Sequence, residues 1–423
     1  MKGIVIPDGY KSIIYKIFVT AAENEFDVYI VGGFVRDLFI NREPKDLDIM
    51  VCGGKNKTDG KLAGINFSKI LANKYKLPPP VSFEKFGTAK LLLNNKEVEF
   101  VMPRKEYYDA NSRNPHTQLA SLKQDALRRD FTINALFLRL KDMKILDFTR
   151  QGIEDIKNKI IRVTDIADAE TIFRQDPLRI LRAIRQSLQL DFKIEPRTFS
   201  AMKMSSTRIK IVPSKRIRDE INKILIADNP SKAFILILKI NLLNNVIPEL
   251  QNLKQTRKHS LASAFARTMK IIDSIRNDIV LRMAALMHDI VEYSKHKKLC
   301  VKTYPYKSQN ENGKEIELIL GRLKYSKEFI KKTTSIVQNG IYVKTYSSQW
   351  TDGMVRKFAK KCGNELDLIM EFSEAYYAKN DERIKINELK KRIEDLKSKN
   401  TFYNSQILTG MEEVINIFNN PAG

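Results

Sequence analysis

The stretch VYIVGGFVRDLFINREPKDLDIMV, residues 28–51, decides how the N-terminal part of this 423-residue chain folds. Apolar and β-branched residues fill 28–31 and 47–51, which predicts two strands with a polar connection between them. Gly32 and Gly33 follow the first strand directly, at a place where residues without a Cβ allow a tight turn. The stretch therefore predicts a strand, a glycine turn and a second strand.

Two carboxylates lie close together where the second strand begins. Asp46 and Asp48 are two residues apart, and side chains two apart on a strand point to the same side of a sheet. Two like charges held side by side need a cation, and oxygen ligands at this spacing suit Mg²⁺. The alternative is an ordinary polar strand end, and the pair alone does not decide between the two.

The glycine turn favours the metal site. Glycines let backbone N–H groups approach a phosphate closely, and an anion is favoured at the start of the helix that we expect around Val35. Arg36 adds a fork of donors that matches phosphate oxygens. We therefore expect a triphosphate site beside a Mg²⁺ site, as in nucleotidyl transfer. Its triphosphate residues would be Gly32, Gly33, Arg36 and Asp37.

This stretch resembles the first motif of the class II tRNA nucleotidyltransferases, the CCA-adding enzymes, and of the related bacterial poly(A) polymerases. Further segments resemble the later motifs of this family in the same order: RRDFTINALF at 128–137, ILDFTRQGIEDIKNKIIR at 145–162 and FRQDPLRILRAIR at 173–185. Similarity of lesser specificity extends over nearly the whole chain. The resemblance implies an untemplated enzyme that extends the 3′ end of RNA.

The resemblance also implies roles for single residues. The segment at 145–162 would connect the catalytic head to a helical neck, with Asp147 and Gly152 at its marked positions. The second motif would serve the ribose and phosphates of the incoming nucleotide, through Arg128, Arg129, Asp130 and Asn134.

Two residues of the last motif could select the base. Asp176 and Arg179 are three apart on the expected helix and so share a face. A carboxylate acceptor beside a guanidinium donor matches the Watson–Crick edges of C and A but not those of G and U. The protein itself would then be the template, whereas the alternative is an ordinary intrahelical ion pair. Arg182 and Arg185 continue this face, and we expect at least one of them to reach the triphosphate.

The sequence departs from the family pattern at several positions. Gln175 stands where an acid is usual, Gln186 where a phenylalanine is usual, and Lys215-Arg216-Ile217 where a Glu-Arg-Ile stretch is usual. These changes leave the metal site untouched and bear on nucleotide selectivity and register. Glu99 is a possible third carboxylate of the metal site, for which we favour a structural role.

Composition and charge point to a polyanionic partner. Lys and Arg total 74 against 50 Asp and Glu, and the net charge of +24 favours nucleic acid, although an A+T-rich genome could also enrich Lys, Asn and Ile. The three cysteines have no metal-like spacing, which fits a reducing compartment. We see no secretory N-terminus and no apolar run that could span a bilayer, so we expect a cytoplasmic monomer without membrane contact.

These patterns predict an α+β fold. We expect a nucleotidyltransferase head with a mixed β-sheet and helices at 1–152, because apolar spacing becomes helical from about residue 153 onward. The rest would be all-helical: a neck at 153–230 with nucleotide-selecting and RNA-binding elements, a body at 231–345 and an RNA-binding tail at 346–423. The tail resembles one that normally runs on a little further.

The body resembles a degenerate HD phosphohydrolase-like domain, at LRMAALMHDIVEYSKHKK, residues 281–298. His288 and Asp289 could ligate a metal, but a working site needs further ligands and the chain has only four histidines. Where related domains place ligand histidines, this sequence has Gln309, Asn310, Gln338 and Asn339. We therefore interpret the pair as a relic of helix packing. The alternative is an RNA-binding or signalling protein in which this region works and the head is inert.

We predict that the protein adds or repairs the CCA end of tRNA from CTP and ATP, with Mg²⁺ as cofactor and release of pyrophosphate. Asp46 and Asp48 would be both catalytic and metal-binding. Poly(A) synthesis, CC-only addition and A-only addition remain open, because the motifs hardly separate these activities.

Overall fold

The computed structural model describes residues 5–54, 62–107, 116–253, 262–299, 309–377 and 380–399. Two compact units are present, and neither corresponds to one continuous segment. The first consists of Met1–Arg216 with Leu236–Val246, and the second of Ile217–Ile235 with Ile247–Gly423.

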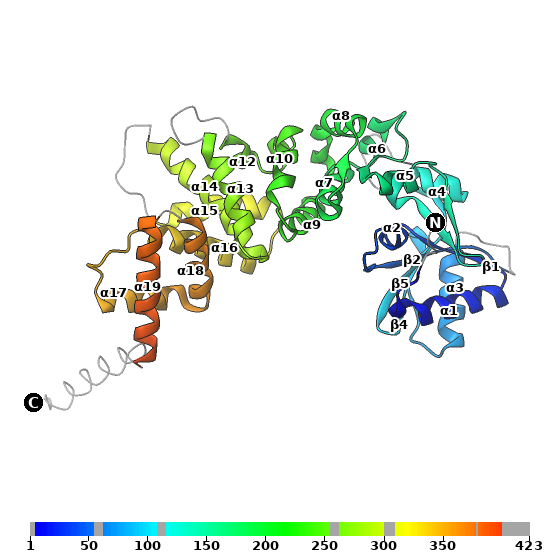
Figure 1. The fold of residues 1–423 in the computed structure, drawn as a ribbon, viewed down its shortest axis with the longest axis horizontal. Helices are drawn as coiled ribbons and strands as arrows, with labels where there is room; N and C mark the ends of the chain where they lie inside the picture. The colour runs from blue at the N-terminus through cyan, green and yellow to red at the C-terminus, as the bar shows by residue number, and fades with distance from the viewer. Residues whose placement is uncertain are drawn as a thin grey trace, which may run out of the picture. The chain divides into compact units, whose positions relative to one another are not determined.

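A seven-stranded mixed sheet forms the core of the first unit (Figure 1). Only β2 and β5 run parallel, and every other neighbouring pair is antiparallel. The strands expected from the opening stretch are confirmed as β1 and β2, side by side in the middle of the sheet. The strand order is β3 (Val81–Phe83), β4 (Thr88–Leu93), β5 (Lys96–Val101), β2 (Leu47–Gly53), β1 (Phe26–Val31), β8 (Leu136–Arg139) and β9 (Lys144–Asp147).

Helices cover this sheet because its strands are apolar on both sides. On one side, α1 (Asp8–Glu23) packs on β1, and α3 (Ala63–Lys74) packs on β2, β4 and β5. Figure 1 shows these two helices next to each other. The other side holds a buried cluster that reaches α4 (Leu122–Arg128), and a small hairpin of β6 (Arg104–Tyr107) and β7 (His116–Leu119) packs against that helix through β6. The buried cluster is Tyr29, Val31, Met50, Ala126, Ala135 and Phe137.

Two short elements complete the head around the glycine turn. The helix α2 (Gly33–Phe39) starts directly after Gly32 and packs against β1 and β8. Gly32 has a φ of +77°, a conformation that side chains other than glycine rarely adopt. The single turn η3 (Thr132–Asn134) packs on α2 and leads into β8.

Helices dominate the chain beyond residue 153, as the apolar spacing predicts. The exception is a short parallel pair, β10 (Ile160–Ile161) with β11 (Lys193–Ile194). The helices of this part up to residue 252 are α5 (Gly152–Lys157), α6 (Ala169–Gln175), α7 (Leu178–Leu190), α8 (Pro196–Met204), η4 (Ser206–Ile211), α9 (Ser214–Leu225), α10 (Ser231–Lys239), α11 (Leu243–Val246) and α12 (Pro248–Asn252).

The described residues in the rest of the second unit are also mainly helical. Three of its helices, α14, α16 and α18, pack on one another and form its centre. The described elements are α13 (Ala262–Ser274), α14 (Ile279–Leu299), α15 (Gln309–Arg322), α16 (Lys327–Val343), α17 (Asp352–Cys362), η5 (Gly363–Glu365), α18 (Leu366–Tyr376) and α19 (Asn380–Ser398). The tail at 408–423 and Cys300 lie outside the described residues.

His288 and Asp289 lie inside the packing of the second unit. The ring of His288 is fully buried and stacks on Tyr376 at 3.5 Å between centroids. Asp289 accepts hydrogen bonds from Thr268 Oγ1 at 2.5 Å and from Tyr376 and Arg267. Each of these contacts joins α14 to a neighbouring helix, which agrees with a packing role for the pair.

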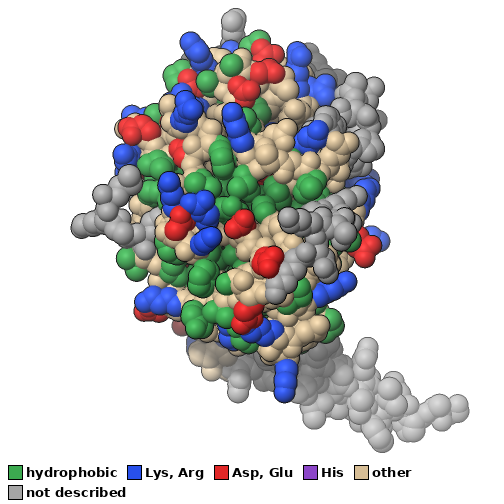
Figure 2. All heavy atoms as spheres, turned by 90° about the vertical axis from the view of Figure 1, so that its right-hand side faces the viewer, with side chains coloured by type: hydrophobic (Ala, Val, Ile, Leu, Met, Phe, Trp, Pro, Cys, Tyr) green, Lys and Arg blue, Asp and Glu red, His purple; other side chains and the backbone are tan. Residues whose placement is uncertain are grey.

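Charged side chains of both signs are mixed on the face drawn in Figure 2. Lys and Arg lie among Asp and Glu there, and hydrophobic side chains gather near the centre of the view. The excess of basic residues therefore forms no single continuous stripe on that face. In the described part of the chain, no helix is both long and apolar enough to cross a membrane.

Candidate active site

Asp48 has two acidic neighbours where β2 begins. Asp48 lies on β2, and its register partner on the parallel strand β5 is Glu99, so both side chains point to the same side of the sheet. Asp46 directly precedes the strand and acts on the charge of Asp48. Glu99, for which we favoured a structural role, is thus the register partner of Asp48, and the pairing of Asp46 with Asp48 as metal ligands stays a prediction.

The surroundings of Asp48 disfavour its negative charge. Burial and the neighbouring charges of Glu99 and Asp46 raise the pKa of Asp48 to about 6, against a partial offset from Arg129. A carboxyl group held in this way is stabilised by a cation. The same side chain that the DLD pattern singles out is thus electrostatically incomplete without a positive charge.

The residues present fit a Mg²⁺ ion that shares its ligands with a nucleotide. Among the described residues, no group of three or more His, Cys, Asp and Glu side chains is close enough to hold a metal by itself. Mg²⁺ commonly binds through one or two carboxylates together with substrate phosphates. The charge of Asp46 acts on Asp48, and the pKa of Asp48 is raised. Both features fit a metal ion that is held by one or two carboxylates together with the phosphates of a nucleotide.

The glycine turn lies directly beside Asp48. A Cβ built on Gly32 would lie 3.2 Å from Nη1 of Arg129 and 3.9 Å from Oδ2 of Asp48. Any side chain at this position would therefore crowd Arg129 and contact Asp48, and the positive φ excludes most residues in addition. Gly32 N–H donates to the carbonyl of Leu136, which fixes the turn to β8. The predicted triphosphate turn and the predicted metal ligands are thus neighbours.

Arg36 joins this turn to the second motif. Its Nε and Nη2 donate to Oδ1 of Asp37 at 2.9 and 2.7 Å, and its Nη1 donates to Oδ1 of Asn134 at 2.7 Å. Gly33 lies against the same guanidinium group. The structure therefore brings together all four predicted triphosphate residues and the predicted sugar residue Asn134.

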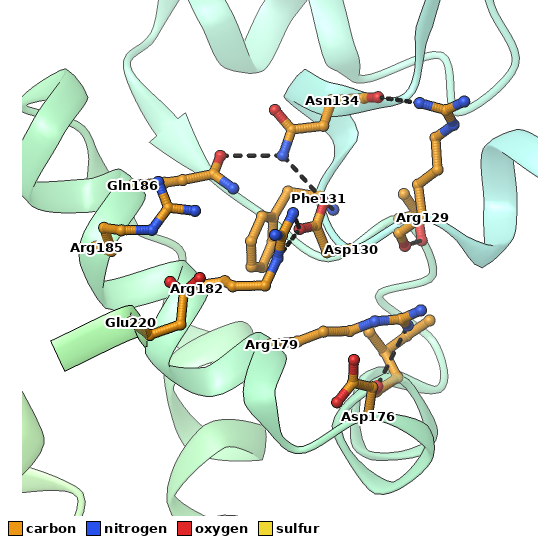
Figure 3. Close-up of polar contacts among 12 residues, drawn as sticks. Arg129, Asp130, Phe131, Asn134, Asp176, Arg179, Arg182, Arg185, Gln186 and Glu220 are labelled. Atoms are coloured by element: carbon orange, nitrogen blue, oxygen red, sulfur yellow. Dashed lines mark hydrogen bonds and ion pairs between the residues drawn. The ribbon is translucent and has the colours of Figure 1, made fainter. Parts of the chain in front are cut away.

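Asp130 forms the centre of the neighbouring network in Figure 3. Its Oδ2 accepts from Nε and Nη2 of Arg182 at 2.8 and 2.6 Å, and its Oδ1 accepts from Nδ2 of Asn134 at 2.9 Å. Burial alone would raise the pKa of Asp130, but Arg182, Asn134 and Arg179 together hold it well below its usual range. Asp130 therefore remains ionised and ties α7 to the second motif.

Asp125 is a site residue that the sequence analysis missed. Its fully buried carboxylate accepts from Nε of Arg128 at 2.9 Å and from Nε of Arg129 at 3.0 Å. Both arginines come from the second motif, and Asp125 stands three and four residues before them on α4. That helical spacing was the available signal. Arg128 also donates to the carbonyl of Arg104 at 2.7 Å, so it is oriented by the head itself.

The expected single helix through the selecting motif is wrong. The helix α6 ends at Gln175, Asp176 has an extended backbone with φ −134° and ψ 95°, and α7 starts at Leu178. Pro177 explains the break, because a proline disfavours the helical conformation of the residue before it. Oδ1 of Asp176 accepts from the backbone N–H of Leu178 at 3.2 Å, which satisfies a donor at the start of α7.

Asp176 and Arg179 nevertheless remain neighbours across this break. Arg179 N–H donates to the carbonyl of Asp176 at 3.0 Å, whereas the two side chains point to different partners (Figure 3). The buried guanidinium of Arg179 donates to the carbonyls of Ile172 and Arg128 at 3.3 and 2.8 Å. Oδ2 of Asp176 lies 3.8 Å from Nη2 of Arg216, which follows the departing residue Lys215. The intrahelical ion pair considered as the alternative is therefore not what joins these residues.

The two remaining arginines of α7 differ. Arg182 is held by Asp130, while Nη1 of Arg185 donates to Oε1 of Gln189 one turn further along the helix.

The structure explains why a glycine stands at position 152, one of the two marked positions of the connector, because a Cβ there would lie 2.6 Å from the carbonyl oxygen of Thr132. Asp147 accepts from the N–H groups of Thr149 and Ile153 and so fixes the turn before α5.

Two family models match the chain at these elements. A model of the poly(A) polymerase head domain matches residues 28–162, and a model of the probable RNA- and SrmB-binding site of polymerase A matches residues 191–254. The first match contains the DLD stretch and the second motif. The second begins directly after α7 and ends two residues beyond α12.

Known proteins resemble the chain over the same region. A tRNA nucleotidyltransferase of Schizosaccharomyces pombe is 29% identical over 323 residues, which cover 67% of this chain and 64% of the relative. An A-adding tRNA nucleotidyltransferase of Aquifex aeolicus is 34% identical over 227 residues, which cover 53% of this chain and 26% of the relative. The chain thus matches less than two thirds of the length of either protein.

The fold has solved counterparts as well. The CCA-adding enzyme of Bacillus stearothermophilus, solved in complex with CTP, superimposes with a TM-score of 0.65 at 20% identity and covers 99% of this chain and 90% of its own. This likeness shows the α+β head followed by helices. Together with the two family matches and the neighbouring DLD and RRDFTIN segments, it leads to one conclusion: residues 28–162 match the head domain of the poly(A) polymerases, in a chain that resembles the CCA-adding tRNA nucleotidyltransferases.

Proposed function

We propose that the protein is an untemplated RNA 3′-nucleotidyltransferase that adds or repairs the CCA end of tRNA from CTP and ATP. The observation that carries the proposal is the position of Asp48, which is the register partner of Glu99 and lies next to the glycine turn. Burial and the charges of Glu99 and Asp46, which raise the pKa of Asp48 to about 6, support it. A cation would stabilise the charge of Asp48, and the neighbouring glycine turn and Arg36 are suited to bind an anion. A metal-bound triphosphate provides both charges.

The proposed reaction forms one phosphorus–oxygen bond and breaks one, and the proton of the RNA 3′-hydroxyl group passes to solvent. The 3′-oxygen of the RNA bonds to the α-phosphorus of CTP or ATP, and the bond from that phosphorus to the β-phosphate oxygen breaks, which releases pyrophosphate. Bound Mg²⁺ would supply charge stabilisation for the attacking and the leaving oxygen, and Asp46 and Asp48 are the residues that would hold it. Arg36 and the turn at Gly32 and Gly33 would orient the triphosphate.

The remaining network would receive the sugar and the base. Asn134 and Asp130 hold each other and would bind the ribose. Arg182 compensates the charge of Asp130, so the pair can lie beside a polyphosphate without adding negative charge. Asp176 and Arg179 would contact the base, which requires Arg179 to release at least one of its two carbonyl partners when a nucleotide enters.

The net charge of +24 supports RNA as the second substrate. We propose that helices beyond about residue 160 bind the RNA backbone and that the protein works as a cytoplasmic monomer. Because such contacts release counterions, RNA binding should weaken steeply as salt increases. Nucleotide binding at the head should depend on salt much less.

A-only addition and poly(A) synthesis are the second candidates, and the named activity of the Aquifex aeolicus relative favours the first of them. The deciding experiment incubates the protein with tRNA that lacks its CCA end, Mg²⁺ and CTP, ATP or both, and sequences the products. Three added nucleotides followed by a stop support CCA addition, whereas a long A tract means a polymerase. Addition of A only to tRNA that already ends in CC means an A-adding enzyme, and no addition to any RNA rejects the proposal.

A further inference from the structure

Gln186 departs from the family pattern and is buried, with only 4% of its surface exposed. It lies on α7, one residue after the last arginine of the selecting motif. Its Oε1 accepts from Nδ2 of Asn134 at 3.0 Å and lies 3.4 Å from Nη1 of Arg36, which also donates to it. A residue that differs from the family thus contacts two predicted nucleotide-binding residues.

The chemistry of the partners fixes the orientation of both amides. Arg36 can only donate, so Oδ1 of Asn134 and Oε1 of Gln186 must both face it. Ionised Asp130 can only accept, so Nδ2 of Asn134 must face it. Figure 3 shows Asn134 between Gln186 and Asp130, with its Nδ2 donating to both. Neither amide can turn over without breaking a contact to a charged group.

This network joins three elements that the sequence separates widely. Arg36 comes from α2, Asn134 from η3 at the second motif and Gln186 from α7. The proposed triphosphate residue and the proposed sugar residue therefore share one acceptor on the helix that also carries Arg179 and Arg182. A phenylalanine at this position has no acceptor and could make no such connection.

We propose that Gln186 is a positioning residue for the nucleotide. Its carbonyl oxygen holds Asn134 and Arg36 in the orientation that receives the ribose and the triphosphate, and it couples both to α7. This inference rests on the proposed function, since it assigns a ribonucleoside triphosphate to these residues. It adds that a hydrogen-bond acceptor on α7 orients both proposed nucleotide-binding residues.

The test compares Gln186→Leu, which removes the acceptor at similar size, with Gln186→Glu, which keeps an acceptor oxygen. CTP and 2′-deoxy-CTP binding is measured by calorimetry without RNA, so no turnover is needed. For Gln186→Leu we expect the Kd for CTP to rise about tenfold, since two hydrogen bonds of which one is to a charged group are lost. The preference for CTP over 2′-deoxy-CTP should fall as well, because Asn134 loses its orientation. Gln186→Glu should stay within about threefold of the wild type, because both donors keep their acceptor.

Gln251→Leu is the matched control. Gln251 is also a buried amide, on α12 of the second unit, and its Oε1 has no hydrogen-bond partner among the described residues. This variant should bind both nucleotides like the wild type. If Gln186→Leu does not fold, Gln186→Met takes its place, since it also lacks a strong acceptor.

Three results would overturn the proposal: a Gln186→Leu variant with wild-type affinity and sugar preference, a Gln186→Glu variant as weak as Gln186→Leu, or an equal loss in the Gln251→Leu control. Failure of the proposed function looks different. In that case the wild type binds CTP and the Kd values of the variants still differ from it as predicted, but no nucleotide is transferred to any RNA. A wild type that does not bind CTP at all would reject both.

Discussion

Asp48 on β2 and Glu99 on β5 are register partners on two parallel strands, so that two acidic side chains lie next to each other on the same side of the sheet. When both side chains are ionised, their negative charges repel each other and destabilise the folded protein. A cation bound next to the glycine turn would relieve this repulsion between the two carboxylates. This relationship gives the first prediction.

Asp48→Asn should stabilise the metal-free protein. The folded-state pKa of Asp48 is raised from 3.8 to about 6, so the stability linked to its protonation is present at low pH and is lost as the pH rises through about 6. The melting temperature of the variant should therefore exceed that of the wild type above about pH 6 and equal it below about pH 4. Thermal denaturation across this range in the presence of a chelator checks the prediction. A variant that is less stable than the wild type at neutral pH would contradict it.

Arg179→Ala should lose discrimination between the correct and the incorrect nucleotides. If the guanidinium reads the base edge, the rates with GTP and UTP should approach those with CTP and ATP, and the measurement is misincorporation into tRNA that lacks its 3′ end. Arg139→Ala is the control, because Arg139 is an exposed arginine of β8 paired with Asp142. Unchanged selectivity in Arg179→Ala would mean that its bonds to the carbonyls of Ile172 and Arg128 are its whole role.

Gly152→Ala should destabilise the first unit. The new Cβ would lie 2.6 Å from the carbonyl oxygen of Thr132 and 2.9 Å from Cδ2 of Leu136, and we expect a loss of about 1–3 kcal/mol in the free energy of unfolding. Gly321→Ala is the matched control within α15. It meets no atom within 4 Å and should gain up to about 1 kcal/mol from helix propensity. Urea denaturation of both variants measures the difference, and equal effects would refute the packing argument.

Asp289→Asn should destabilise the second unit in a pH-dependent way. Burial opposes its charge, but donors that include His288, Arg267 and Thr268 lower the pKa of Asp289 to about 2. Stability from this carboxylate is therefore present above about pH 4 and is lost as the pH falls toward 2. The wild type should exceed the variant by about 3 kcal/mol near neutral pH, because a buried carboxylate that holds several donors is lost. Nucleotide addition should be unchanged. If the wild type has a metal-dependent phosphodiesterase activity that the variant lacks, this would instead support the alternative in which the HD-like region is the working part of the protein.

The central part of the fold could be predicted from the opening stretch. Strands at 28–31 and 47–51 follow from their apolar, β-branched runs, and the turn between strand and helix follows from Gly32 and Gly33. The strands β3, β8 and β9 were not foreseen. They have only three or four residues each, and pairing with a neighbouring strand makes them regular. The helices beyond residue 153 were predictable because their apolar spacing is long and regular.

Some contacts of the candidate site could not be predicted from residue spacing along the sequence. Sequence spacing singled out Asp48, whose charge is acted on by Asp46 and Glu99. It also placed Asp176 and Arg179 on one helix, since it ignored the effect of Pro177 on the residue before it. Contacts across long separations were not accessible in this way. The bond of Gln186 to Asn134 spans 52 residues and depends on how α7 packs on the head, so Gln186 could be recognised only as a departure from the family.

The most direct test of the account measures CMP incorporation into tRNA that lacks its CCA end, with and without Mg²⁺, for the wild type, Asp46→Ala and Asp48→Ala. Circular dichroism and CTP binding are followed in parallel. We predict Mg²⁺-dependent incorporation by the wild type and none by either variant, although both fold. Full incorporation by a folded Asp46→Ala or Asp48→Ala variant would contradict the assignment of these carboxylates as the metal ligands of a nucleotidyltransferase.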